Sequence, residues 1–108
     1  MRYLMFVCTD TEPQADQSQV PDIETWVADN DKAGRRVLGN VLAPPSTATT
    51  VRVRDGRLHL TDGPFAETTE VIVGFDILEC ADLDEAIEVA RTHPMAWGGR
   101  VELRAFAD

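Results

Sequence analysis

The chain has 108 residues, of which 44% are hydrophobic and 27% charged, and its formal net charge is −9. A chain of this length is predicted to fold as one domain, residues 1 to 108, with a modest core. The negative charge argues against a nucleic-acid partner, which would require a basic patch, and the sequence has no apolar run of the roughly 18 residues that span a membrane.

The first part of the chain predicts a strand, a loop and a helix. Residues 2 to 8 are apolar on both alternating faces, which is typical of a central strand. This run is too short for a secretory signal and lacks a cleavage site. Pro21 is predicted to open a helix after an exposed loop. Apolar residues recur at helical spacing at Ile23, Trp26, Val27, Val37, Leu38 and Val41, and Gly39 can end the helix. Gly34 weakens this pattern, so the helix either bends or ends early there.

A β-hairpin is predicted for residues 48 to 54 and 57 to 61, around the turn Asp55-Gly56. The turn fixes a register in which the pairs are Arg54 with Arg57, Val53 with Leu58, Arg52 with His59, and Val51 with Leu60. The valines and leucines then share one face, and Arg52 and His59 share the other.

Residues 62 to 70, Asp-Gly-Pro-Phe-Ala-Glu-Thr-Thr-Glu, follow the hairpin and combine a rigid turn with an aromatic ring and several carboxylates. Residues 71 to 80 predict a second central strand. Asp82 is predicted to cap a helix with Glu85 in a capping box. The face of that helix toward the sheet would carry Leu83, Ala86, Ile87 and Ala90. His93-Pro94 should stop it, residues 95 to 99 form a loop, and residues 100 to 106 form the last strand.

The predicted order is strand, helix, strand pair, central strand, helix, strand. Two central strands with two helices on one face indicate an α+β fold of the ferredoxin-like kind, with an antiparallel sheet. Both faces of residues 2 to 8 and 71 to 80 are apolar, yet helices cover only one. We therefore expect a homodimer in which a second subunit covers the other face.

The motif Asp-Gly-Pro-Phe-Ala-Glu-Thr (62 to 68) resembles the signature of the DGPF proteins, part of the YCII-related superfamily. The flanking segments 47 to 56, 83 to 90 and 98 to 104 resemble that family as well. The resemblance implies a dimeric α+β barrel. It implies little about activity, because members resemble accessory proteins of sigma factors as well as small cofactor-free enzymes. The suspected catalytic His of YCII proteins has no match by motif here.

This sequence departs from the family pattern at three positions. Thr69 stands where a Lys is common, Val73 where a Gly is usual, and Asp76 where an aromatic residue is usual. The missing Lys removes a cation beside Glu67 and Glu70. A mechanism that relies on a charged pair in this loop is therefore not expected.

Three residues are candidate catalytic groups. Asp62 is either a general base at the rim of a cleft or an acceptor of backbone N–H groups in its own turn. Asp76 lies among apolar strand residues, and a buried carboxylate must be paired, protonated or functional. The alternative for Asp76 is exposure, or an ion pair with a neighbouring strand through Arg2, Arg100 or Arg104. His93 is either near a cleft or a cap at the end of its helix.

The remaining candidates are binding residues. Glu67 and Glu70 are paired carboxylates or an acidic surface, with no His at metal-ligand spacing. The walls of a substrate cleft are predicted to carry Phe65, Tyr3, Trp26 and Trp97. His59 is predicted to be at the surface. Cys8 and Cys80 are predicted to be buried free thiols in a reducing cytoplasm.

Two functions are consistent with the sequence. The first is a catalytic or small-molecule-binding dimer that needs no cofactor. In it, Asp62 or His93 would move protons on a small organic substrate. The second is a regulatory module without catalysis, whose acidic surface binds a basic partner.

Overall fold

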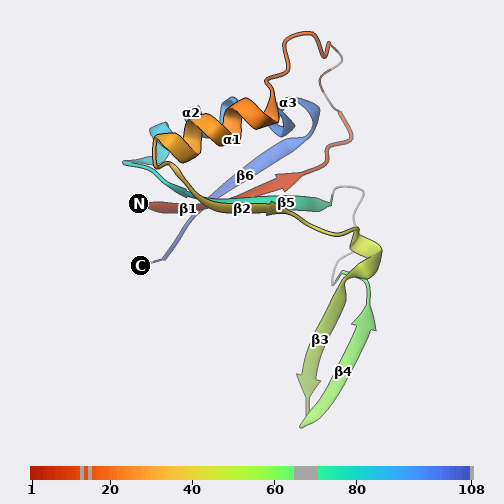
Figure 1. Cartoon of the computed structure of the whole chain (residues 1–108). Helices are drawn as coiled ribbons and strands as arrows, with labels where there is room; N and C mark the ends of the chain where they lie inside the picture. Colours follow the sequence, from red (N-terminus) through yellow and green to blue (C-terminus); the bar gives the residue numbers. More distant parts are fainter. Residues whose placement is uncertain (13, 15, 65–70, 108) are drawn as a thin grey trace.

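Figure 1 shows the computed structural model of the chain, which describes all residues except 13, 15, 65–70 and 108. The elements in chain order are β1 (Arg2–Cys8), α1 (Ile23–Lys32), β2 (Arg36–Val41), the short 3-10 helix η1 (Pro45–Thr47), β3 (Thr49–Arg54), β4 (Arg57–Asp62), β5 (Ile72–Glu79), α2 (Leu83–Arg91), α3 (Met95–Gly98) and β6 (Arg100–Ala105). A four-stranded antiparallel sheet has the order β2-β5-β1-β6, and the helices lie on one of its faces. The described part of the chain is therefore a mixed α+β structure.

The core lies between the sheet and the helices. Alternate residues of β1 (Tyr3, Met5 and Val7) are buried on this side, and Leu78 of β5 pairs with Tyr3. The helices contribute Trp26 from α1 and Ala86, Val89 and Ala90 from α2. The two strands predicted to be central, β1 and β5, are the two inner strands of the sheet, so that prediction is confirmed.

Acidic side chains cap the two longer helices; the cap at Asp82 was predicted, whereas α1 was predicted to open at Pro21 and instead has Asp22 as its cap. Asp22 accepts a hydrogen bond from the backbone N–H of Thr25, and Asp82 accepts one from that of Glu85, each at 2.9 Å. The Glu85 carboxylate reaches back to the N–H of Ala81 at 3.2 Å, one residue before the cap. This is the reciprocal arrangement of a capping box, displaced by one position.

The predicted packing face of α2 was partly wrong. Ala86 and Ala90 are buried, but Leu83 is 50% exposed and Ile87 45% exposed, while Val89 is buried in their place. Leu83 and Ile87 instead line a shallow groove beside β6 together with Leu103. The prediction of a loop over residues 95 to 99 is also partly wrong, because the short helix α3 forms there.

The predicted first helix was too long, because α1 ends at Lys32 and does not continue to Gly39. Gly34 adopts a left-handed conformation with a φ of 72°, which a glycine accepts without strain. Ending early at Gly34 was one of the two predicted alternatives. Residues assigned to the helix, including Val37 and Val41, instead form the edge strand β2. Residues 36 to 41 form a strand and not a helix because their backbone groups pair with β5.

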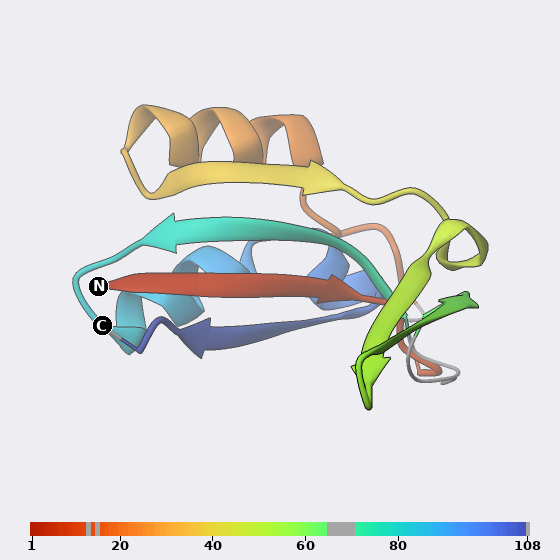
Figure 2. The same ribbon diagram turned by 90° about the horizontal axis from the view of Figure 1, so that it is seen from below.

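The predicted hairpin and its register are confirmed, with Val53 opposite Leu58 and Arg52 opposite His59. The hairpin does not join the main sheet; β3 and β4 form a separate two-stranded sheet. Figures 1 and 2 show this arm projecting from the sheet on the side away from the helices. Its apolar face, which consists of Val51, Val53, Leu58 and Leu60, is exposed.

The sheet face opposite the helices is apolar along its two inner strands. The register places Leu4 opposite Ile77 and Phe6 opposite Phe75 on this face, and all four side chains are only partly buried. We call this surface the open face. Because of the projecting arm, the Cα radius of gyration is 16.0 Å, compared with about 13 Å for a compact chain of similar length.

Candidate functional site

A cavity with a volume of about 560 Å³ lies between α1, the edge of the sheet and the turn that follows α2. Its walls are mainly apolar, with Val7, Ile23, Trp26, Val27, Val41, Val73 and Met95 among them. Three side chains that carry charge or titrate also line it, namely Arg36, Asp76 and His93. An apolar hollow of this size with a few convergent polar groups is typical of a small-molecule site.

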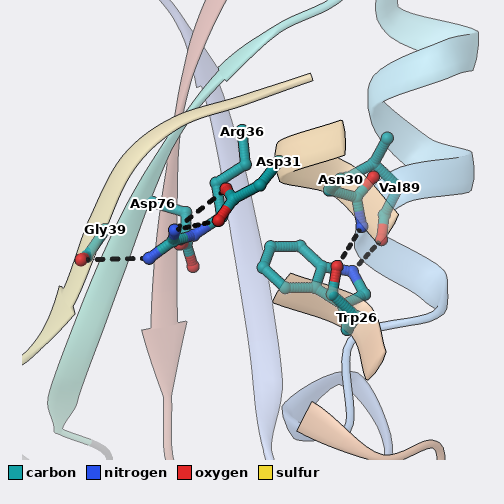
Figure 3. Close-up of polar contacts among 7 residues, drawn as sticks. All are labelled: Trp26, Asn30, Asp31, Arg36, Gly39, Asp76 and Val89. Carbon is teal, nitrogen blue, oxygen red and sulfur yellow. Dashed lines mark hydrogen bonds and ion pairs between the residues drawn. The ribbon is translucent and has the colours of Figure 1, made fainter. Parts of the chain in front are cut away.

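Asp76 and Arg36 form an ion pair at this cavity. The Nε of Arg36 donates to Oδ1 of Asp76 at 2.8 Å. The same guanidinium donates to Oδ1 of Asp31 at 3.1 Å and to the carbonyl of Gly39 at 3.1 Å (Figure 3). Arg36 therefore joins the last turn of α1, the edge strand β2 and the inner strand β5, and its donors are directed at protein acceptors.

Burial makes the charged form of the Asp76 carboxylate less favourable than it would be at the surface. The residue is only 6% exposed, and burial raises the pKa of Asp76 by more than the hydrogen bond from Arg36 lowers it. The nearby Asp31 raises the pKa of Asp76 further. A carboxylate of this kind accepts a proton more readily than one at the surface.

Gly39 makes room for that carboxylate. It lies opposite Asp76 in the β2–β5 register. A Cβ atom at position 39 would lie 1.9 Å from Oδ1 of Asp76, far inside van der Waals contact. The side chain of residue 76 therefore occupies the space that any larger residue at position 39 would fill.

His93 is a buried, neutral imidazole. The residue is 5% exposed, and burial lowers the pKa of His93 to about 4. Its Nδ1 accepts a hydrogen bond from the backbone N–H of Met95 at 2.9 Å, within the turn that starts α3. Its ring meets that of Trp26 edge to face, with centroids 4.6 Å apart. Backbone and aromatic contacts thus fix both the position and the orientation of the ring.

Trp26 is itself anchored from both helices. Its Nε1 donates to the carbonyl of Val89 in α2 at 2.8 Å, and the side-chain amide of Asn30 donates to the Trp26 carbonyl at 2.8 Å (Figure 3). The wall that faces the ion pair is consequently rigid.

The structure brings together three of the residues predicted from the sequence, Asp76, His93 and Trp26. Tyr3 is buried in the core, and Trp97 donates from Nε1 to the carbonyl of Arg91 at 3.0 Å; neither lines this cavity. Asp62 is exposed at the end of β4 and does not line it. The predictions for Phe65, Glu67 and Glu70 fall outside the residues that the structure describes.

The ion-pair partner of Asp76 differs from the predicted ones. The sequence pointed to Arg2, Arg100 or Arg104 on a neighbouring strand, but the partner is Arg36 on β2. Arg2 pairs with Glu79 instead, at 3.6 Å. The sequence pattern misses Arg36 because it assigns β2 to the end of a helix. Gly34 is the signal that could have revealed this partner, because a helix that ends at Gly34 allows a strand to begin at Arg36.

Other site chemistries find no support within the described ranges. No cluster of three or more metal-ligating side chains occurs among the described residues. Cys8 and Cys80 are free, and burial raises the pKa of both thiols, as expected of structural cysteines. Cys80 is buried as predicted, whereas Cys8 is only partly buried, on the open face. Outside the undescribed positions, no helix is long and apolar enough to cross a membrane.

The fold and site together define a small α+β protein with an apolar cavity that holds a buried ion pair and a neutral histidine. Residues 1–107 match the YCII-related domain, and the chain belongs to that family. It is also similar to an uncharacterized protein of Rhizobium meliloti (strain 1021), with 48% identity over 50 residues. That segment covers 46% of this chain and 40% of the relative.

Proposed function

We propose that the protein binds a small organic molecule in the cavity beside Asp76 and His93, and that it acts on this molecule by acid–base chemistry without a cofactor. The observation that carries the proposal is the presence of a buried carboxylate and a buried imidazole on the wall of one apolar cavity. Groups that burial perturbs in this way cluster at functional sites.

The two titratable groups have complementary properties. The raised pKa of Asp76 makes its carboxylate a better proton acceptor than a surface carboxylate. Arg36 stays charged and holds the carboxylate in place through Nε. Apolar walls strengthen these electrostatic interactions by keeping water away from them. Phe65, Glu67 and Glu70 of the motif belong to this proposal as further contacts to the substrate, whereas Asp62 does not, because it lies outside the cavity.

We also propose that the working form is a homodimer, a dimeric α+β barrel built from two ferredoxin-like subunits. The strand order β2-β5-β1-β6 with helices on one face supports the ferredoxin-like description. The apolar open face around Phe6 and Phe75 supports the dimer, because a surface of this kind is usually covered by a partner. A cytoplasmic location is part of this proposal.

A regulatory partner-binding module is the second candidate. The observation that favours it is the projecting arm, whose apolar side chains lie in solvent; Leu60, for example, is 64% exposed. This function does not require the cavity to be occupied, so a ligand experiment distinguishes the two.

The test of ligand binding is a thermal-shift screen of small ketones, lactones, phenols and organic acids against the wild type, Asp76→Asn and Asp62→Asn. A ligand at 100 times its dissociation constant stabilises the fold by about 2.7 kcal/mol, a shift of several degrees in Tm for a domain of this size. We expect hits that weaken in Asp76→Asn and persist in Asp62→Asn, since Asp62 is outside the cavity. Hits unaffected by either change would contradict the assignment to this cavity.

The dimer is tested by light scattering coupled to size-exclusion chromatography. Phe6→Glu on the open face should shift the mass from dimer to monomer, whereas Arg91→Glu on the exposed side of α2 should leave it unchanged. A wild-type protein that is monomeric at all concentrations would refute this part of the proposal.

A further inference from the structure

The hydrogen bond between Met95 and His93 determines which imidazole nitrogen carries the proton. A backbone N–H can only donate, so the Nδ1 atom that receives it at 2.9 Å must present a lone pair. In a neutral imidazole the hydrogen then resides on Nε2. His93 is therefore fixed in the Nε2–H tautomer and has one donor left to offer.

That donor has no protein acceptor in the described part of the chain. Within the described residues, the His93 side chain makes one hydrogen bond, to the N–H of Met95, and one ring contact, with Trp26. Yet the residue is almost completely buried and lines the cavity. Among the described residues, the buried side-chain polar atom without a partner is Nε of Arg35 and not Nε2 of His93. Nε2 of His93 is therefore accessible from the cavity, where an acceptor atom on a ligand can take its hydrogen bond.

The charges around the cavity limit what this ligand can be. The guanidinium of Arg36 is the cation of the described lining, and its donors go to Asp76, Asp31 and Gly39. An anionic ligand would find no unpaired cation in that lining and would meet the Asp76 carboxylate. The apolar walls also favour an uncharged molecule.

We propose that the ligand is an uncharged, largely apolar carbonyl compound, such as a ketone, ester or lactone, whose oxygen accepts a hydrogen bond from Nε2–H of His93. This inference rests on the proposed function and gives the two polar groups separate roles. His93 is a donor that polarises the carbonyl, as neutral imidazoles do. Asp76, which lines the same cavity, then acts as the proton acceptor.

The test uses two probes of similar shape, acetophenone and ethylbenzene, of which only the first has a carbonyl oxygen. Their dissociation constants are measured by NMR titration on the wild type, His93→Asn and His93→Gln. An Asn can keep an acceptor for the Met95 N–H but has no donor at the place of Nε2, whereas a Gln amide can supply one there. Comparing variants cancels the different solubilities of the probes.

We expect the preference for acetophenone over ethylbenzene to fall about tenfold in His93→Asn, the effect of one lost hydrogen bond to a buried donor. His93→Gln should recover part of it. A preference that is the same in all three proteins would overturn the inference while the proposed binding function survives. If neither probe binds the wild type, the inference is refuted, and the thermal-shift screen decides the proposed function separately.

A second measurement does not depend on whether the variants fold. Long-range ¹H–¹⁵N spectra of the wild type distinguish a protonated from an unprotonated imidazole nitrogen. At pH 7 His93 should show a protonated Nε2 and an unprotonated Nδ1, and acetophenone should shift Nε2 while ethylbenzene does not. A protonated Nδ1 would overturn the inference.

Discussion

Arg36 on the edge strand and Asp76 on the inner strand β5 are joined by a 2.8 Å hydrogen bond that lies at the wall of the cavity. The carboxylate is nearly inaccessible, while the Arg36 side chain keeps 18% of its surface exposed. A pair of this kind is costly to break from one side, because the remaining charge stays buried. The ion pair therefore ties the integrity of the cavity to the attachment of an edge strand.

The first prediction concerns this pair. Arg36→Met should lower the free energy of unfolding by about 3 kcal/mol, because it leaves the Asp76 carboxylate buried without a partner. The double variant Arg36→Met/Asp76→Leu should recover most of the loss. Urea unfolding at pH 7 measures both. Arg2→Met is the control, since the Arg2–Glu79 pair is half exposed and should contribute at most about 1 kcal/mol.

The second prediction concerns Gly39. Gly39→Ala should destabilise the protein by about 2 kcal/mol and disturb the Asp76 carboxylate, because the new methyl group overlaps Oδ1. Asp76→Ala removes the obstructing carboxylate but not the carbonyl oxygen of Phe75, which is 2.8 Å from the new Cβ. The two changes together should therefore cost less than the sum of each alone, although more than Asp76→Ala by itself. A double-mutant cycle by urea unfolding gives the coupling. Strictly additive effects would contradict the steric explanation.

The third prediction is a pH dependence that His93 causes. Its pKa is about 4 in the folded protein, whereas a histidine that is not buried has an ordinary pKa of 6.5. Between these values the unfolded state binds more protons, so stability falls as the pH drops from about 6.5 to 4, by about 3 kcal/mol in total. His93→Asn should flatten this part of the curve. The comparison with the wild type removes the contribution of all groups that the two proteins share.

The control for that measurement is His59→Asn, because His59 is exposed on the arm. The free energy of unfolding of this variant should depend on pH in the same way as that of the wild type. An unchanged slope in His93→Asn would show that His93 is not buried in its neutral form.

The fourth prediction concerns the cap of α2. Asp82→Ala should cost about 1 kcal/mol because the N–H of Glu85 loses its acceptor. Asp84→Ala, which changes a neighbouring acidic residue that does not cap the helix, is the matched control and should cost a few tenths of that amount. Thermal unfolding at pH 7 compares the two. Equal losses in both variants would point to a general charge effect at the helix N-terminus.

The sequence was sufficient for elements whose signal is local. The Asp55-Gly56 turn fixed the hairpin register, and Asp82 marked the start of α2, because a turn and a cap each depend on a few adjacent residues. The apolar runs of β1 and β5 identified the inner strands. The apolar neighbours of Asp76 in the strand pattern indicated its burial, although exposure stayed open as an alternative, and the residue is buried.

The partners across the sheet were not predictable in the same way. Residues 36 to 41 fit a helical period as well as a strand, and only pairing with β5 decides between the two. If residues 36 to 41 are assigned to a helix, Arg36 is not expected to lie beside Asp76. The position of His93 against Trp26 depends on how α1 and α2 pack, which one sequence does not encode locally.

The arm formed by β3 and β4 has a second side, where the register brings Arg54 opposite Arg57 and Arg52 opposite His59. The like charges of Arg54 and Arg57 weaken the pairing of the arm, but the arginines on this side also repel the arm of any other molecule that approaches with the same side. Salt screens that repulsion. In this acidic protein, a small basic surface thus opposes the unspecific stacking of arms, and raising the ionic strength should weaken that opposition.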